Sequence, residues 1–278
     1  MKPRFTFIDL FSGIGGFHFG LSRIGGKCVL ASDIDPIANE SYKRNFKVVP
    51  CGDIKKVKPS QIPVFDILCG GFPCQSFSNV GPGGGLKDPR GALIYEVFRI
   101  LKHKQPKAFI LENVKRLKSF NNGKTLEYIV KRLRRLKYDV KYDILEATDF
   151  NLPQIRKRLF IVGVHKEQNA SFSFPKLLKL KKKLSDVMKG KTERDYAYTI
   201  RIGGRRSGIH NRFNWDCYIV NGKPRYINVE ECLILQGFPR KFKLAGNNDQ
   251  QMKQVGNSVP TTIVREIGKS LLNSGCLD

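Results

Sequence analysis

The chain has 278 residues, 41% of them hydrophobic, which is enough for one large domain, or a large and a small one, with a packed core. Lys and Arg number 50 against 24 Asp and Glu, and this formal net charge of +26 indicates a polyanionic partner. The chain has neither an apolar run of about 18 residues nor a basic amphipathic anchor, which argues against a membrane protein. A solvated basic surface without a partner is the alternative.

The N-terminus and the cysteines indicate a cytoplasmic protein. Met1–Arg4 lead directly into a strand-like run, without the apolar region of a secretory signal. The seven cysteines are scattered, odd in number and without a C-x-x-C pair. This pattern argues against structural zinc and for a reducing compartment, so we expect no metal.

Short apolar runs alternate with amphipathic stretches in residues 1–165. Strands are predicted at Phe5–Leu10, Cys28–Ser32, Phe65–Cys69, Ala108–Leu111, Val140–Glu146 and Leu159–Val164. Helices are predicted at Gly16–Ile24, Pro36–Asn45, Ala92–His103 and Thr125–Leu136. Strands separated by helices of this length form βαβ units, so we predict an α/β fold with a mostly parallel sheet.

The pattern changes after about Lys166. Residues 176–191 carry seven Lys and one Asp, which is typical of a solvated linker or helix face. Residues 201–208 are rich in Gly, which allows close backbone approach, and in Arg, whose fork of donors fits guanine or phosphate. An ordinary basic turn is the alternative for that segment. Residues 255–260 are predicted as a loop before a closing helix at Thr261–Leu272.

A glycine-rich loop and two acids indicate a cofactor site. Asp9–Gly16 contains the pattern Gly-x-Gly-Gly between a predicted strand and a predicted helix, where a ligand can approach the backbone. Asp33 ends the second strand, where a ribose diol is bound, and Asp53 is suited to accept from an adenine amino group. No basic residue near these loops suits a pyrophosphate, which favours S-adenosylmethionine over NAD. For Asp35, a helix cap before Pro36 is an equal alternative.

Cys74 is the strongest sign of chemistry. It lies in Gly70–Ser76, which follows a predicted strand and so presents a thiol at the carboxyl edge of the sheet. The four dispersed histidines disfavour a Cys–His hydrolase. A thiolate can instead attack C6 of cytosine when an acid binds N3, after which C5 accepts a methyl group from a sulfonium. Glu112, at the end of Ala108–Leu111, suits the role of that acid if burial or base contact raises its pKa.

Arg156 and Arg158 precede another apolar strand. Two residues apart on an extended chain, their side chains are expected to point the same way, one toward the O2 carbonyl of the base and the other toward a phosphate. A charged strand edge is the alternative for the arginines, and a helix-capping acid is the alternative for Glu112.

These motifs, in their order, resemble those of the C5-cytosine DNA methyltransferases of the restriction-modification type. One motif can arise by chance, whereas eight in order do not, and the resemblance covers nearly the whole chain. The segments that carry it are Phe7–Gly16, Asp33–Ile34, Asp53, Pro73–Gln75, Glu112–Val114, Gln154–Arg158, Arg225–Pro239 and Gly256–Pro260. The family often has Glu at position 33, where this chain has Asp.

The resemblance implies three sets of site residues. Catalysis is assigned to Cys74, Glu112, Arg156 and Arg158. Cofactor contacts are assigned to Phe11, Ser12, Gly13, Ile14, Gly15, Gly16, Asp33, Ile34, Asp53, Ile54, Gly71, Pro73, Leu93, Asn257 and Ser258, with Phe11 stacked on adenine. DNA contacts are assigned to Gln75, Ser78, Lys87, Arg90, Arg201, Gly203, Gly204, Arg205 and Arg206.

The resemblance further implies two domains. Residues 1–165, completed by residues 250–278, would form a Rossmann-like catalytic and cofactor-binding domain, and residues 166–249 a small target-recognition domain. The implied reaction moves a methyl group from S-adenosylmethionine to C5 of a flipped-out cytosine through a covalent Cys74–C6 adduct, leaving S-adenosylhomocysteine. Double-stranded DNA is the implied partner, and residues 79–91 would close over it.

The resemblance also bears on the cellular role. The methylated DNA would be protected from a cognate restriction endonuclease that acts separately. We expect a monomer, associated with the nucleoid when it is bound to DNA.

Three other functions are open. A tRNA cytosine methyltransferase on the same scaffold is disfavoured because the chain lacks the Cys-Phe-Thr element of those relatives. A decayed, non-catalytic DNA-binding protein is disfavoured by the presence of Cys74, Glu112 and Arg158. An NAD-dependent oxidoreductase is remote because phosphate-binding groups are missing from the first loop.

Overall fold

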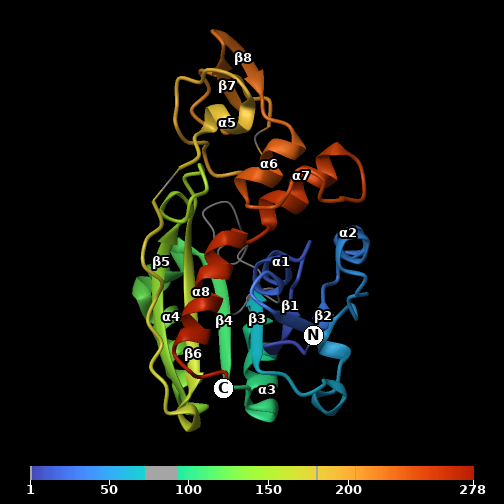
Figure 1. Ribbon diagram of the computed structural model, residues 1–278, viewed down its shortest axis with the longest axis vertical. Coiled ribbons are helices and arrows are strands. Elements are labelled where there is room, and N and C mark those ends of the chain that lie inside the picture. The colour runs from blue at the N-terminus through green and yellow to red at the C-terminus, as the bar shows by residue number, and fades with distance from the viewer. Residues whose placement is uncertain (1, 73–92, 180, 204) are drawn as a thin grey trace.

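The computed structural model describes residues 2–72, 93–179, 181–203 and 205–278 (Figure 1). Its sheet contains β1 (Phe5–Leu10), β2 (Gly26–Ser32), β3 (Ile67–Gly71), β4 (Ala108–Val114), β5 (Tyr138–Glu146) and β6 (Lys157–His165). The helices around it are α1 (Gly16–Ser22), α2 (Pro36–Phe46), α3 (Ile94–Lys104), α4 (Lys124–Arg135) and α8 (Thr261–Asn273). Each predicted strand and helix of residues 1–165 therefore exists, with its ends shifted by a few residues.

The strand order is β2-β1-β3-β4-β6-β5. β1 pairs in parallel with β2 and β3, and β3 with β4, whereas β6 runs antiparallel to both of its neighbours. Residues 147–156 connect β5 to β6 without an α-helix, and so short a connection returns the next strand antiparallel. The predicted α/β fold with a mostly parallel sheet is confirmed.

Helices cover both faces of the sheet. α1 and α8 pack on the core that contains Phe7, and α3 and α4 pack on the core that contains Ile8, because successive side chains of a strand point to opposite faces. α1 and α8 approach each other closely at Gly20, where a Cβ would lie 2.8 Å from both Thr261 O and Val264 Cγ1. This contact ties the C-terminal helix to the first helix.

A smaller unit lies above the sheet in Figure 1. It consists of α5 (Leu184–Met188), a hairpin of β7 (Cys217–Val220) and β8 (Lys223–Tyr226), α6 (Val229–Leu235) and α7 (Asn248–Asn257). Trp215 is fully buried in its core, together with side chains of all three helices. The lysines at 181–183 and 189 flank the short α5 and are exposed, as the predicted solvated segment requires.

The two cores divide the chain at different points from those predicted. Phe172 packs on the first core, where its carbonyl accepts from Lys141 Nζ at 2.6 Å, and Leu178 packs nearby. Met252 and Val255 of α7, by contrast, belong to the core of the smaller unit. The changes of core therefore fall later than residues 166 and 250, because apolar side chains in irregular segments join the core that they contact.

The return to the sheet also differs from the prediction. Residues 255–257, predicted as loop, form the last turn of α7, and Ser258–Pro260 connect it to α8. Asn247 begins α7 with a capping box, since its side chain accepts from Gln250 N, and this Asn-x-x-Gln pattern was a readable signal. Among the helices that the structure describes, none has the length and apolar character to span a bilayer.

Candidate active site

The strand order places a topological switch point at the carboxyl ends of β1 and β3. The chain leaves β1 for β2 on one side and later returns to β3 on the other, so the order reverses between β1 and β3. Ligands of open α/β sheets bind at such a reversal. Phe11–Gly15 follow β1 at this edge, and Phe72 follows β3.

Strand register brings Glu112 and Arg158 to the same edge. Gly71 pairs with Glu112, and Val114 pairs with Arg158. Because β6 is antiparallel, its first residues lie where the parallel strands end. Arg158 Nε is 3.0 Å from Glu112 Oε1, and each side chain is 14% exposed.

The surroundings of Glu112 favour its protonated form. Burial raises the pKa of its carboxyl, and the charges of Arg158 and Arg156 offset part of that shift. A Cβ at Gly71 would lie 3.3 Å from Glu112 Oε2, so the glycine leaves the space beside the carboxyl open. The site thus combines an acid of raised pKa with a cation that orients it.

Asn113 connects this acid to the cysteine motif. Its buried Nδ2 donates to Phe72 O at 3.0 Å, which fixes the main chain one residue before Pro73. The nucleophile predicted from the sequence, and several predicted cofactor and DNA contacts, lie outside the described residues: Pro73, Cys74, Gln75, Ser78, Lys87, Arg90 and Gly204.

Arg156 does not share the position of Arg158, contrary to the prediction. Its side chain is 1% exposed. Nη1 donates to Ile200 O at 3.2 Å, and Nη2 donates to Gly256 O at 2.8 Å and Ser258 O at 2.9 Å. The prediction assumed an extended chain through both arginines, but β6 begins only at Lys157. The Arg156 guanidinium therefore serves the main chain.

Two glutamines complete this junction. Gln154 Oε1 accepts from Ile200 N at 3.2 Å, and its Nε2 donates to Leu235 O at 3.0 Å. Gln236 Nε2 donates to Val255 O at 3.0 Å and Ser258 O at 3.2 Å. Both side chains are fully buried. The sequence showed the Gln-x-Arg-x-Arg motif, but it did not show that Gln154 and Arg156 connect the chain before β6 to the smaller unit.

The first loop is held against the end of β2. Gly13 N donates to Asp33 Oδ2 at 2.8 Å, and Ser12 N donates to Ser32 O at 3.0 Å. Phe11 has a φ of 55°, a left-handed conformation that is uncommon outside glycine. Gly15 also has positive φ, and a Cβ there would lie 2.3 Å from the Phe46 ring. The loop therefore has one sterically determined path past Asp33.

The three acids near this loop differ in role. Asp33 accepts from Gly13 N and Asp35 N, and burial raises its pKa. Asp35 caps α2 by accepting from Ile37 N and Ala38 N, as its alternative interpretation expected. Asp53 accepts from Lys55 N at 3.0 Å and lies near the end of β2, because Ser32 Oγ donates to Gly52 O at 2.6 Å.

Two side chains near the first loop stand out by their exposure or their lack of a partner. Ile34 is 75% exposed beside Asp33, an unusual exposure for a large apolar side chain next to a glycine-rich loop. Ser12 Oγ is buried and has no hydrogen-bond partner among the described residues. Ile14 and Ile54, also predicted as contacts, are buried in protein cores, so their side chains pack against protein.

The C-terminal return lies beside this loop. A Cβ at Gly16 would lie 2.6 Å from Val259 Cγ1 and 2.8 Å from Ser258 Oγ. Ser258 is buried, whereas Asn257 is exposed, so only the latter presents its side chain openly. Leu93, the remaining predicted contact, directly precedes α3.

The predicted DNA-contacting loop is partly committed to protein contacts. Arg205 pairs with Asp249 of α7, and Trp215 Nε1 donates to Gly203 O at 2.9 Å. Arg201 and Arg206 are exposed, and Arg206 N donates to Asp216 Oδ2 at 2.9 Å. The ion pair of Arg205 departs from the prediction, because an acid distant in sequence lies within reach of its side chain.

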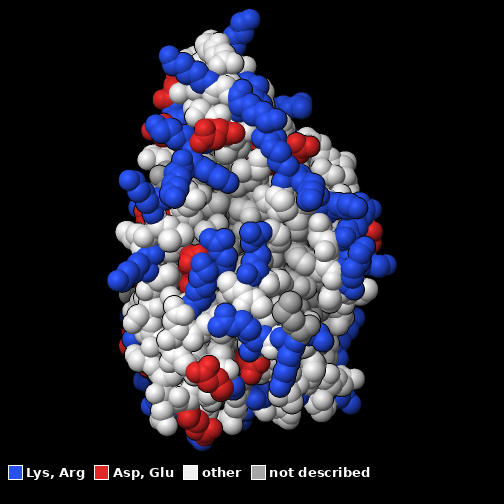
Figure 2. Space-filling view, viewed as in Figure 1, with Lys and Arg blue, Asp and Glu red and all other residues white. Residues whose placement is uncertain are grey.

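Basic side chains dominate the surface near the junction. On the face seen in Figure 2, Lys and Arg gather on the smaller unit and around its contact with the sheet, while Asp and Glu are scattered. Within the described ranges, no three His, Cys, Asp or Glu side chains are grouped as metal ligands. The charge suits a polyanion that lies across the two units.

The fold and the site define a class: a Rossmann-like methyltransferase with its polar edge at the switch point of the sheet. The model of the C-5 cytosine-specific DNA methylase family matches residues 5–212 and 201–273. The chain belongs to this family, and it is therefore a DNA cytosine-5 methyltransferase by class. The members of this family use S-adenosylmethionine in general.

Curated relatives and solved structures agree with this assignment. The chain is 38% identical to Type II methyltransferase M.DsaV of Dactylococcopsis salina, over 98% of this chain and 87% of the relative. It is 33% identical to Type II methyltransferase M.HhaI of Haemophilus parahaemolyticus, over 96% and 94%. In fold it is similar to the S. pombe Dnmt2 methyltransferase, with a TM-score of 0.75 and 20% identity over 97% of this chain and 99% of that one.

Proposed function

We propose that this protein methylates C5 of a flipped-out cytosine in a short duplex DNA site, with Cys74 as nucleophile and S-adenosylmethionine as methyl donor. The observation that carries the proposal is the Glu112–Arg158 pair, whose atoms are 3.0 Å apart at the carboxyl edge. It lies one strand from the chain that leads into Pro73 and Cys74.

Glu112 is proposed to bind the N3 edge of the base. A carboxyl of raised pKa can keep a proton at that edge, and the proton makes C6 electron-poor. Arg158 orients Glu112 and offers its remaining guanidinium donors to the O2 carbonyl. Arg156 is proposed as a positioning residue, since its guanidinium is occupied by main-chain carbonyls.

The residues around the first loop are proposed to hold the cofactor. Asp33 would bind the ribose, Ile34 and Phe11 would contact the adenine, and Asp53 would accept from its amino group. The exposed Ile34 and the unpartnered Ser12 Oγ support this placement. When bound, the cofactor supplies an electrophilic methyl group on a sulfonium.

The proposed covalent chemistry balances without a metal. The Cys74 thiolate bonds to C6, and the electron pair of the C5–C6 double bond becomes available at C5. C5 then takes the methyl group, and the sulfonium becomes the thioether of S-adenosylhomocysteine. Loss of the C5 proton to solvent restores the double bond and expels the Cys74 thiolate.

The smaller unit is proposed as the target-recognition domain, and its exposed Arg201 and Arg206 as DNA contacts. Flipping the cytosine costs a few kcal/mol, which contacts to the surrounding DNA must offset. The methylated site would be protected from a separate cognate restriction endonuclease. The enzyme would act as a cytoplasmic monomer, associated with the nucleoid through its DNA.

Bisulfite sequencing of plasmid DNA from cells that express the protein tests the proposal. The wild type is expected to protect cytosines in one short repeated context. Cys74→Ala is expected to protect none while still binding DNA, because the phosphate contacts remain. Equal conversion in the two samples would contradict the proposal, and methyl transfer to tRNA would then distinguish an RNA methyltransferase from a decayed enzyme.

A further inference from the structure

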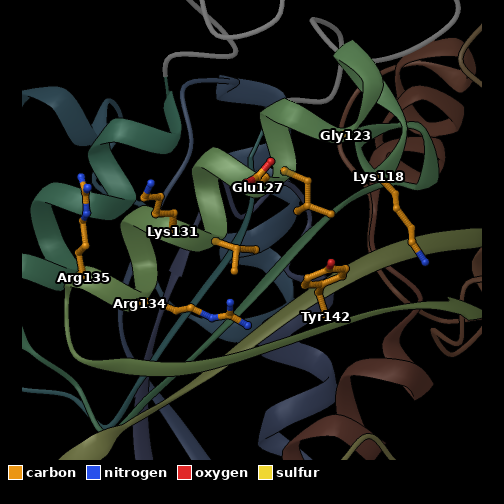
Figure 3. A pocket seen from close by; sticks show the side chains of 9 residues that line it. Lys118, Gly123, Glu127, Lys131, Arg134, Arg135 and Tyr142 are labelled. Carbon is orange, nitrogen blue, oxygen red and sulfur yellow. The ribbon is translucent and has the colours of Figure 1, made fainter.

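A groove of about 750 Å³ runs between α4 and the edge strand β5, outside the site described above. Leu126 and Val130 are its apolar lining residues. The 40% exposed Tyr142 of β5 lies across from α4 (Figure 3). One end lies at Lys118, in the turn that follows β4. The groove therefore begins near the strand that carries Glu112 and continues along the flank of the sheet.

The walls of this groove are strongly basic. Residues 115–141 contain ten Lys and Arg and two acids, Glu127 and Asp139, a net charge of +8. Four cations line the groove: Lys118, Lys131, Arg134 and Arg135. None of the four forms an ion pair with any residue that the structure describes.

The cations are arranged along the helix. Figure 3 shows Arg134 reaching from α4 toward Tyr142, while Lys131 and Arg135 extend side by side from the helix away from that ring. Arg134 Nη2 also donates to Val140 O at 3.2 Å, which holds its guanidinium at the base of the groove. Basic groups thus border α4 on both sides.

Protection of the sheet edge does not account for this density of charge. Charged side chains protect an edge strand when they lie on that strand, whereas Lys131, Arg134 and Arg135 lie on α4. Like charges four residues apart, as Lys131 and Arg135 are, repel each other and destabilise a helix. An anion bound along α4 would relieve that repulsion, and Tyr142 offers it a hydroxyl donor.

We propose that this groove binds the phosphate backbone of duplex DNA outside the active-site cleft. α4 has 12 residues and so is about 18 Å long. That length matches the rise of roughly five base pairs at about 3.4 Å each. Lys, Arg and Tyr are among the side chains that contact phosphates without reading sequence. The inference rests on the proposed function only in taking DNA as the substrate.

Two sources of this backbone are compatible with the groove. The duplex in the cleft can extend along α4, in which case affinity rises with duplex length. A second DNA molecule can instead bind while the first is held, in which case free DNA accelerates release of the first. Both modes of binding depend on the same cations. The dependence of affinity on duplex length and the effect of free duplex on dissociation distinguish them.

The test compares two triple variants that each lower the net charge from +26 to +23. The groove variant is Lys118→Ala, Lys131→Ala and Arg135→Ala, three exposed residues outside the ion pairs of the described ranges. The control variant is Lys27→Ala, Lys58→Ala and Lys102→Ala. These lysines are also exposed, but Lys27 lies on β2, Lys58 between β2 and β3, and Lys102 on α3. The probes are fluorescein-labelled random-sequence duplexes of about 12 and about 30 base pairs.

The affinity for each duplex is measured between 50 and 200 mM salt, together with dissociation under increasing unlabelled duplex. Loss of three phosphate contacts is expected to lower the salt slope by about 2.7, so the wild type should lose about 40-fold more affinity over this range than the groove variant. If the duplex in the cleft extends along α4, the salt slopes of the wild type and the groove variant differ only for the 30-base-pair duplex. If a second DNA molecule binds the groove, free duplex accelerates dissociation of the labelled duplex from the wild type but not from the groove variant. The control variant is expected to match the wild type in the difference in salt slope between the long and the short duplex. It should also match the wild type in how strongly free duplex accelerates dissociation.

If the groove variant matches the control variant in both measurements, the proposal is overturned. If the two triple variants differ in melting temperature, the comparison is repeated with the double variant Lys131→Ala and Arg135→Ala. The double variant Lys27→Ala and Lys102→Ala is then the control. Methyl transfer at saturating plasmid is expected to be unchanged in the groove variant. A wild type that binds DNA through the groove but transfers no methyl group would refute the proposed function and leave this inference standing.

Discussion

The Glu112 carboxyl lies between a glycine and an arginine, and this environment determines its chemistry. Gly71 leaves space at one oxygen, and Arg158 pairs with the other at 3.0 Å. Burial raises the pKa and the arginine limits the rise. In the proposed function, this carboxyl would hold a proton toward the base while Arg158 fixes its orientation.

Glu112→Gln is expected to slow methyl transfer by about 10²–10⁴-fold, because an amide cannot deliver the proton that activates C6. DNA affinity should change little. Single-turnover transfer to plasmid DNA measures the rate, with Glu193→Gln, an exposed acid of the smaller unit, as the control. A near-normal rate for the Glu112 variant would remove the acid from the mechanism.

Asp9 is a buried acid that the proposed chemistry does not use. Burial raises its pKa well above the usual range, and Oδ2 accepts a long hydrogen bond of 3.5 Å from Tyr42. His18 Nδ1 is 2.7 Å from the same hydroxyl, and burial lowers the pKa of that histidine to about 4. His18 is therefore uncharged at neutral pH and does not balance an ionised Asp9.

This arrangement predicts a pH-dependent stability. The raised folded-state pKa means that the unfolded chain loses the Asp9 proton first, near its ordinary pKa of about 3.9. The stability that Asp9 contributes is therefore fully present below that pH and is lost as the pH rises toward the folded-state pKa. Asp9→Asn is expected to flatten this fall, seen as urea midpoints between pH 4 and 8. An unchanged slope relative to the exposed-site control Asp139→Asn would contradict it.

At the scale of elements, the junction around Arg156 unites three segments. Arg156, in the loop before β6, holds the chain at Ile200, which directly precedes the predicted DNA-contacting loop, and the end of α7 and the turn after it at Gly256 and Ser258. The position of that turn relative to β6 therefore depends on one buried guanidinium. Gln154 and Gln236 reinforce the same contact.

Arg156→Ala is expected to lower the free energy of unfolding by about 3 kcal/mol, because it leaves buried carbonyls without donors. Urea unfolding measures the loss, and Arg212→Ala, at an exposed arginine of the smaller unit, is the control with an expected change below about 0.5 kcal/mol. Equal midpoints for the two variants would show that Arg156 does not join the segments.

At the scale of the whole molecule, the charge of +26 governs association with DNA. Basic side chains gather where the two units meet (Figure 2), so neutralised phosphates rather than base contacts should supply most non-specific affinity. With about six phosphate contacts, affinity for a random duplex is expected to fall about 10³-fold between 50 and 200 mM salt. Fluorescence anisotropy measures it, and a flat response would contradict a backbone-driven interface.

Much of this protein was readable without its structure. The alternation of apolar runs and helices predicted β1 to β6, since such signals lie within a few neighbouring residues, and the motifs of the proposed site are local in the same way. The loop predicted at 255–260 was wrong at residues 255–257, which belong to α7. Apolar residues such as Phe172 and Val255 do not indicate in the sequence which core they join.

The sequence by itself determined the family and the fold class, because these depend on local pattern and motif order. Only the tertiary structure decided that Arg158 meets Glu112 while Arg156 is buried, and that Lys131, Arg134 and Arg135 of α4 line a groove beside β5. The partners of Arg156 lie 44 to 102 residues away in the sequence. Strand register and packing between units determine such contacts, and neither is encoded in a local run of residues.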